Sequence, residues 1–106
     1  MNILLALWIF IGTLNGVSYQ VEAIPNNNKA DTKRTLLTGE NKGVYLIQTW
    51  EFDCKQRTVR NTHYKLFAPT DELIEEEDLM RPTLKVERNS LADKALDIWC
   101  EKWQKN

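Results

Sequence analysis

Two cysteines carry the clearest chemistry in this 106-residue chain. Cys54 follows the residues WEFD, and Cys100 follows DIW near the end of the sequence. Two cysteines in an exported chain are typical of one disulfide, and a Cys54–Cys100 bridge would close a loop of about 47 residues and contribute roughly 4 kcal/mol. Two free thiols are the alternative. A single histidine and two distant cysteines form no recognised ligand spacing, so we predict a disulfide, no metal and no cofactor.

His63 is the residue best suited to acid–base catalysis, since the ordinary pKa of histidine lies near neutrality. A general base needs a nucleophile or an acid within hydrogen-bond reach, and Asp53 could face His63 across a hairpin. No serine or cysteine motif accompanies this pair, because Cys54 is better used in the bridge. We therefore interpret His63 as an ordinary strand residue and predict no catalytic residues. A hydrolase that uses His63 ranks last among the hypotheses.

Arg57 and Arg60 could together bind a carboxylate or a phosphate. Residues three apart on a strand point to opposite faces, which argues against a shared clamp. We predict a structural ion pair of Arg57 or Arg60 with Asp53 or Glu51, and keep both arginines as candidate partner contacts. Trp103 is a third candidate contact, because aromatic side chains often anchor interfaces.

Charge excludes one class of partner. The chain has 14 Lys and Arg against 15 Asp and Glu, and a binder of nucleic acid needs a basic excess. Residues 75–78, EEED, form an acidic run. Calcium loops space their ligands at alternate positions around a glycine turn, and this run does neither. We predict a solvated acidic surface and no nucleic-acid partner.

Residues 1–23 resemble a secretory signal. Residues 3–14, ILLALWIFIGTL, are apolar and uncharged, and Val21-Glu22-Ala23 places small side chains where a signal peptidase reads them. A membrane anchor is the alternative, but a spanning helix needs about 20 apolar residues. We predict cleavage after Ala23, export to the periplasm or outside the cell, and no membrane span in the mature form. Residues 24–43, rich in Asn, Lys, Thr and Gly, are predicted to form a flexible arm.

Strand patterns begin at residue 44. Residues 44–54 and 57–67 alternate in polarity and predict two strands joined as a hairpin. Residues 71–80 fit a short helix or an acidic excursion between strands. Residues 83–87 alternate as a short third strand.

A C-terminal helix follows Ser90. Apolar residues recur there with helical spacing, and Ser90 with Asp93 resembles a capping box. Trp50 and Trp99 are predicted to lie in the core. The predicted fold is α+β, with a small antiparallel sheet (a hairpin plus a short third strand) and a C-terminal helix tied to it by one disulfide, all within a domain of residues 44–106.

The order of these features resembles the bacterial surface-adhesin protein E family. An aromatic strand ends in Asp-Cys, Arg-Thr-x-Arg lies on a second strand with a tyrosine, and after a proline and a short strand Ser-Leu opens a helix that ends in Cys. The matching residues, within about residues 44–103, are Trp50, Phe52, Asp53, Cys54, Arg57, Thr58, Arg60, Tyr64, Ser90, Leu91 and Cys100. The resemblance implies an exported antiparallel-sheet protein with a disulfide-tied helix, and the family's best-known member is a dimeric adhesin that binds host matrix proteins.

Members of that family usually carry further strands in an N-terminal half, where we expect this chain to have only the arm. We predict a small exported non-enzymatic protein, a surface or periplasmic binding module that is adhesin-like and binds a protein or another envelope or matrix component. The alternative is a secreted inhibitor or toxin-like effector, whose arm at residues 24–34 would insert into a cleft. An exposed sheet edge also allows a homodimer.

Overall fold

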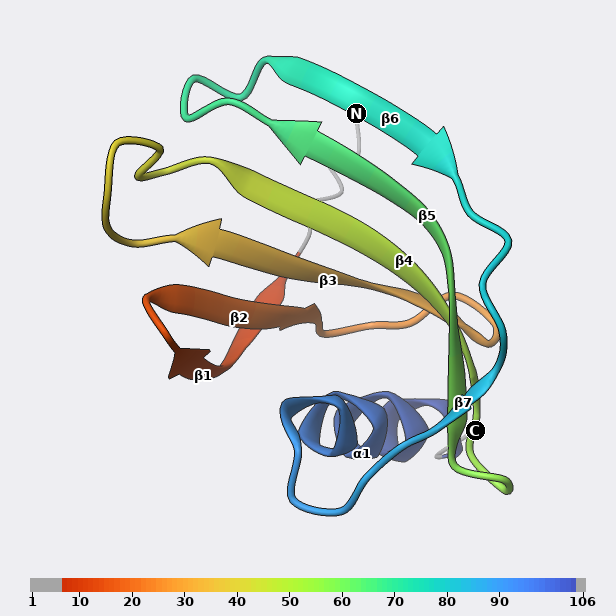
Figure 1. The fold of residues 1–106 in the computed structure, drawn as a ribbon. Helices are drawn as coiled ribbons and strands as arrows, with labels where there is room; N and C mark the ends of the chain where they lie inside the picture. The colour runs from red at the N-terminus through yellow and green to blue at the C-terminus, as the bar shows by residue number, and fades with distance from the viewer. Residues whose placement is uncertain (1–6, 105–106) are drawn as a thin grey trace, which may run out of the picture.

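The computed structural model describes the backbone of residues 7–104 and the side chains of residues 7–101. One antiparallel sheet dominates the fold, with α1 against one of its faces (Figure 1). The strands lie in the order β1-β2-β3-β4-β5-β6, and β7 pairs with β5. The elements are β1 (Trp8–Leu14), β2 (Val17–Glu22), β3 (Lys29–Leu36), β4 (Tyr45–Asp53), β5 (Thr58–Phe67), β6 (Leu73–Asp78), β7 (Leu84–Lys85) and α1 (Leu91–Gln104).

The β4–β5 hairpin confirms the central prediction. Its register runs from Tyr45 opposite Phe67 to Asp53 opposite Thr58, with one irregularity after Thr49. Asp53 Oδ1 accepts a hydrogen bond from the Gln56 amide at 2.9 Å, which closes the turn. Short polar side chains that bond to the backbone two or three residues later favour such turns.

The sheet is larger than predicted, because three strands precede the hairpin. β1 and β2 lie within residues 1–23, and β3 lies within the predicted flexible arm, residues 24–43. The β1–β2 turn is Asn15-Gly16, with φ of 52° and 76°. This is the dipeptide that two-residue hairpins with positive φ favour. The prediction of a sheet with only three strands was therefore wrong, whereas cleavage after Ala23 stays a prediction.

β3 forms although its sequence, KADTKRTL, is mostly polar. It lies between β2 and β4 and pairs with both. Ala30 is buried, while the long side chains of Lys33 and Arg34 extend away from the backbone on opposite faces. A strand in this position is held by its two neighbours, so weak apolar patterning does not prevent it from forming.

The acidic segment is a strand. Residues 73–78 pair with β5 from Phe67 to His63, so neither a helix nor an unpaired excursion forms there. β6 lies at the sheet edge, and all six of its residues are exposed. The third strand predicted at residues 83–87 is present as β7, with only two residues.

α1 begins where the sequence predicts. The Ser90 hydroxyl oxygen accepts a hydrogen bond from the Asp93 amide at 3.1 Å, and Asp93 Oδ2 accepts one from the Asn89 amide at 3.0 Å. These two bonds satisfy amide groups at the helix start, as a capping box does.

The core lies between α1 and one end of one sheet face, which we call the helix-side face. Phe52 stacks on Trp99 with ring centroids 5.3 Å apart. The Trp99 indole N–H donates to the Glu22 carbonyl at 3.1 Å, so the helix is bonded to β2. Trp99 is thus a core residue, as predicted. The buried core side chains are Val21, Ala30, Phe52, Val59, Ala95, Leu96, Trp99 and Cys100.

Candidate binding site

The part of the helix-side face that α1 does not cover forms an open groove. Because side chains alternate between faces along a strand, the apolar residues of β2, β3, β4 and β5 line up across this surface. The groove encloses about 220 Å³. Its lining residues are Val17, Tyr19, Arg34, Leu36, Val44, Tyr45, Leu46 and Leu66.

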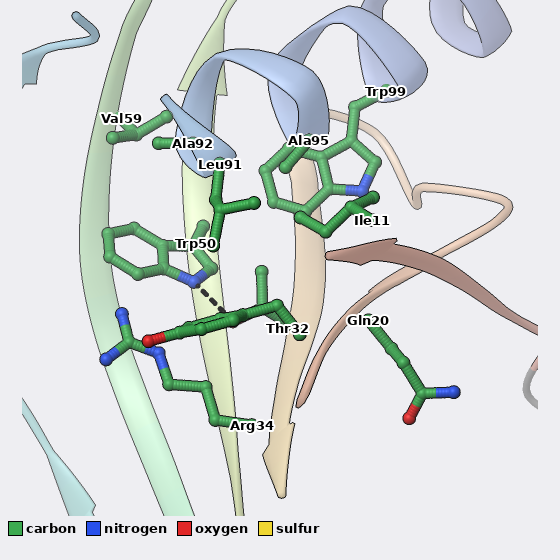
Figure 2. A pocket seen from close by; sticks show the side chains of 11 residues that line it. Ile11, Gln20, Thr32, Arg34, Trp50, Val59, Leu91, Ala92, Ala95 and Trp99 are labelled. Carbon is green, nitrogen blue, oxygen red and sulfur yellow. Dashed lines mark hydrogen bonds between the residues drawn. The ribbon is translucent and has the colours of Figure 1, made fainter. Parts of the chain in front are cut away.

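A smaller cavity of about 80 Å³ lies next to the groove, between the sheet and the first turns of α1 (Figure 2). Tyr19 and Arg34 line both hollows and therefore mark the boundary between them. The residues around the cavity are Ile11, Tyr19, Gln20, Thr32, Arg34, Trp50, Val59, Leu91, Ala92, Ala95 and Trp99.

Arg34 gives this boundary a positive charge. Its guanidinium carbon lies 5.3 Å from the centre of the Tyr19 ring, within the range of a cation–π contact. Within the described residues Arg34 has no ion pair. Near it, the Trp50 indole N–H donates to the Thr32 hydroxyl at 2.9 Å. The groove and cavity thus combine apolar walls with one unneutralised cation.

The opposite border of the helix-side face is acidic. The Tyr64 hydroxyl contacts Glu75 Oε1 at 2.7 Å and Glu77 Oε2 at 2.9 Å. These bonds to the two carboxylates raise the pKa of Tyr64. Strand alternation therefore divides the acidic run between the two faces of the sheet. Glu75 and Glu77 lie on the helix-side face, and Glu76 and Asp78 lie on the outer face. Across the helix-side face, positive charge at β3 is separated from negative charge at β6.

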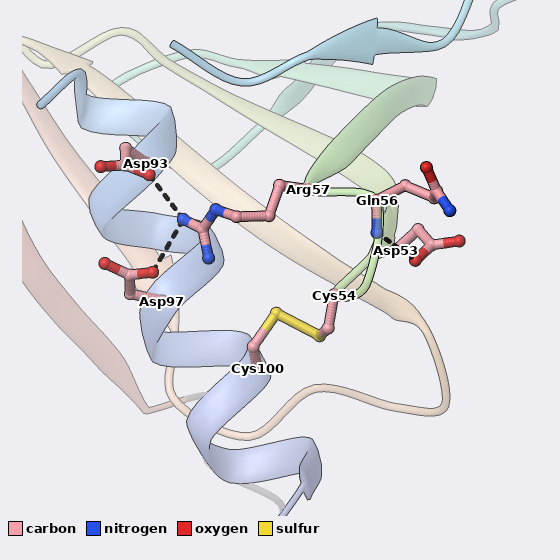
Figure 3. Close-up of a disulfide and its surroundings, with 7 residues drawn as sticks. All are labelled: Asp53, Cys54, Gln56, Arg57, Asp93, Asp97 and Cys100. Atoms are coloured by element: carbon pink, nitrogen blue, oxygen red, sulfur yellow. Dashed lines mark hydrogen bonds and ion pairs between the residues drawn. A yellow bond between two sulfur atoms is a disulfide. The ribbon is translucent and has the colours of Figure 1, made fainter. Parts of the chain in front are cut away.

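The predicted disulfide joins Cys54 to Cys100, with Cα atoms 5.7 Å apart (Figure 3). Arg57 reaches α1 from the same turn: its Nη2 lies 2.5 Å from Asp93 Oδ1 and 2.8 Å from Asp97 Oδ1. The hydrogen bond from the Asn89 amide and the contact with Arg57 lower the pKa of Asp93. Arg57 thus pairs with the helix rather than with Asp53 or Glu51.

Arg60 pairs with Glu51, as predicted. Two nitrogens of Arg60 contact Glu51 Oε1, at 3.0 and 2.7 Å. The pair lies on the outer face, whereas Arg57 turns toward α1, so the two arginines share no clamp. Both side chains remain more than a third exposed. Their role as partner contacts stays a prediction.

His63 lies on the outer face of β5, next to the edge strand β6. Its Nδ1 contacts Asp78 Oδ1 at 2.7 Å and its Nε2 contacts Glu76 Oε2 at 2.8 Å. The hydrogen bond to Asp78, followed by that to Glu76, raises the pKa of His63. The proposed pairing with Asp53 was wrong, since Thr49 lies opposite His63 and Asp53 lies opposite Thr58. His63 therefore links β5 to the acidic edge strand.

Among the side chains of residues 7–101, no group of three or more His, Cys, Asp or Glu is arranged to hold a metal ion. Trp50 lies half-buried beside the cavity and contacts the core, as predicted. The side chain of Trp103 lies outside the described residues. Sequence patterns missed Tyr19 and Arg34, because they fall in segments assigned to a signal and an arm. The alternation of Val17, Tyr19 and Val21 after Asn15-Gly16 could have found Tyr19, whereas no such pattern marks Arg34 on the mostly polar β3.

Comparison with known proteins gives one match. A family model described as surface-adhesin protein E matches residues 15–101. The match begins in the β1–β2 turn and ends in α1, so it extends further toward the N-terminus than the resemblance that begins near residue 44. No curated protein and no solved structure matches the chain. Among the described residues, none of the helical structure has the length and apolar character that a membrane-spanning segment requires.

Proposed function

Because the chain belongs to the surface-adhesin protein E family, we propose that it is an exported, non-enzymatic, adhesin-like module that binds a partner protein on the helix-side face. Family membership suggests a surface adhesin-like role, and the disulfide suits an oxidising compartment outside the cytosol. The proposal assigns the contact to the groove beside α1.

The groove is the observation that carries this assignment. It presents leucine and valine side chains together with a tyrosine and an arginine, and Tyr and Arg are enriched among the residues that dominate binding energy at interfaces. Leu46 and Leu66 lie on paired central strands, opposite each other in the register. A rigid sheet holds such side chains without the ordering cost that a flexible loop pays on binding.

The contacts of His63 support a non-enzymatic role. Both ring nitrogens are engaged by carboxylates, and the ring lies on the outer face, away from the groove and the cavity. This arrangement suits an ion-paired link between two strands. A general base needs a free ring nitrogen directed at the reacting group.

The inhibitor hypothesis depends on a free arm at residues 24–34 that inserts into a cleft. Residues 29–34 belong to β3, which pairs with β2 on one side and β4 on the other. A strand with both edges bonded is not available for insertion into the cleft of an enzyme. No other observation favours the inhibitor or toxin-like role.

Two neighbouring residues with opposite orientations test the binding face. Leu46→Gln changes the groove, and Ile47→Gln makes the matched change on the outer face of the same strand. We expect binding to purified matrix proteins or envelope components, measured by biolayer interferometry, to weaken at least tenfold for Leu46→Gln and to stay near the parent value for Ile47→Gln. Thermal unfolding of both variants controls for stability. Equal binding by the two variants, or no binding by the parent chain to either class, would refute the proposal.

A further inference from the structure

The cavity beside α1 has the composition of a small-ligand site. Its walls are apolar where α1 packs on the sheet, through Leu91, Ala95 and Trp99. Arg34 approaches from the other side and points toward Trp50 (Figure 2). Small-molecule sites typically combine an apolar hollow with a few polar groups that fix orientation.

Arg34 and Thr32 supply hydrogen-bond donors to the cavity. Its lining also includes Tyr19 and Gln20, with side chains that can both donate and accept. Arg34 offers guanidinium N–H groups and no acceptor. The Thr32 hydroxyl oxygen already accepts the Trp50 indole N–H at 2.9 Å, which leaves the Thr32 hydroxyl hydrogen to donate. On the helix-side face, the acids Glu75 and Glu77 lie on β6, three strands away from β3, or about 14 Å at the usual strand spacing. Arg34 is exposed and has no ion pair within the described residues, so it can pair with an incoming anion.

We propose that this cavity binds a short alkyl carboxylate, with the alkyl tail between the sheet and α1 and the carboxylate on Arg34. A bidentate guanidinium–carboxylate pair fixes the head group. The tail is limited by the cavity volume of about 80 Å³. That volume exceeds the roughly 10–15 Å³ that one water needs and is about half of the roughly 150 Å³ cavity that holds benzene. A branched tail of about three carbons, half as many as benzene has, fits these limits.

Isobutyrate is a suitable probe, because it joins a branched alkyl tail of three carbons to a carboxylate. We expect titration of the full chain with isobutyrate to shift the Trp50 indole N–H and Arg34 amide signals in NMR spectra, with millimolar affinity. Isobutyramide has the same tail without the charge, and acetate has the charge without the branched tail. Both should bind at least tenfold more weakly. Equal affinity for isobutyrate and isobutyramide would overturn the role of Arg34.

Four variants separate the parts of the site. Arg34→Gln should weaken isobutyrate binding about ten- to hundredfold, and Arg34→Lys should restore part of it. Ala92 is exposed where it lines the cavity, so Ala92→Leu should leave the folded state intact, and its larger side chain should narrow the opening and weaken binding at least tenfold. Lys65→Gln removes a cation from the outer face and should have no effect.

Isobutyrate binding that is unchanged by Arg34→Gln or by Ala92→Leu, or an absence of shifts in the parent chain at millimolar isobutyrate, would refute the site. These outcomes are independent of the proposed protein-binding role. That role is tested with Leu46→Gln and a protein partner, so either proposal can fail while the other stands.

Discussion

Removal of residues 1–23 should destabilise the fold strongly. Cleavage after Ala23 would remove β1 and β2, and with them Val21, whose side chain is completely buried. Loss of one fully buried valine costs about 1.5–3 kcal/mol. The Trp99 indole N–H would also lose its acceptor, the Glu22 carbonyl, and an unsatisfied buried donor costs about 1–3 kcal/mol. Together these two losses amount to about 3–6 kcal/mol, against a typical domain stability of about 5–15 kcal/mol.

The assay compares the chain of residues 1–106 with a chain of residues 24–106. Urea unfolding followed by circular dichroism gives the free energy of each, with the disulfide intact in both. Amide hydrogen exchange gives a second measure, because β3 becomes an edge strand and its amides that pair with β2 should lose protection.

The result has a direct bearing on the predicted signal. Suppose that the mass of the exported protein shows that its chain begins at Ile24, and that its stability equals that of the full chain. This result would refute the reasoning, since β1 and β2 would then contribute nothing to stability. A form that begins at Ile24 and is much less stable would need another strand paired with β3 to recover the lost stability. That strand would come from a second copy of the chain or from a partner. Edge pairing would then be a requirement for the fold.

Three further predictions concern single features. Replacement of both Cys54 and Cys100 by alanine should lower the free energy of unfolding by about 2–5 kcal/mol, measured in urea, and alkylation of two free thiols in unreduced native protein would contradict the disulfide. Because the pKa of His63 is raised in the folded state, its contribution to the free energy of unfolding should be fully present below the unfolded pKa of about 6.5 and be lost as the pH rises through the folded pKa. The loss should be less than about 1 kcal/mol for this accessible pair. The stability difference between the parent and His63→Gln should therefore shrink from pH 6 to pH 9, and a constant difference would contradict the prediction. Gly16→Ala should destabilise the β1–β2 hairpin by about 1–2 kcal/mol, because φ is 76° at this residue, and an unchanged urea midpoint would exclude the positive-φ turn.

Local patterns predicted the β4–β5 hairpin, α1 and the disulfide, although not β6. The β4–β5 hairpin followed from alternation across a short gap, and α1 followed from helical spacing after Ser90. The disulfide followed from the cysteine count, since two cysteines allow one pairing. Each of these features depends on residues close together in sequence, or on a pairing with no alternative.

The N-terminal half could not be derived in the same way. An uncharged apolar run is expected both of a secretory signal and of a strand, and residues 3–14 satisfy both descriptions. β3 is mostly polar and is held by strands on either side, so its own sequence predicts little. The groove depends on Tyr19 and Arg34 from these two segments. It therefore could not be located until the strand order was known.

The open groove follows from the dimensions of the fold. The residues beneath α1 form a row across four strands, from Val21 on β2 to Val59 on β5, so the helix crosses the strands. A helix is about 10–12 Å wide, whereas a nine-residue strand such as β4 is about 30 Å long. The disulfide and the Arg57 ion pairs fix α1 near the β4–β5 turn. Leu46, six residues before Phe52, lies about 20 Å away along the strand, so one helix held at that end leaves the rest of the apolar face open to a partner.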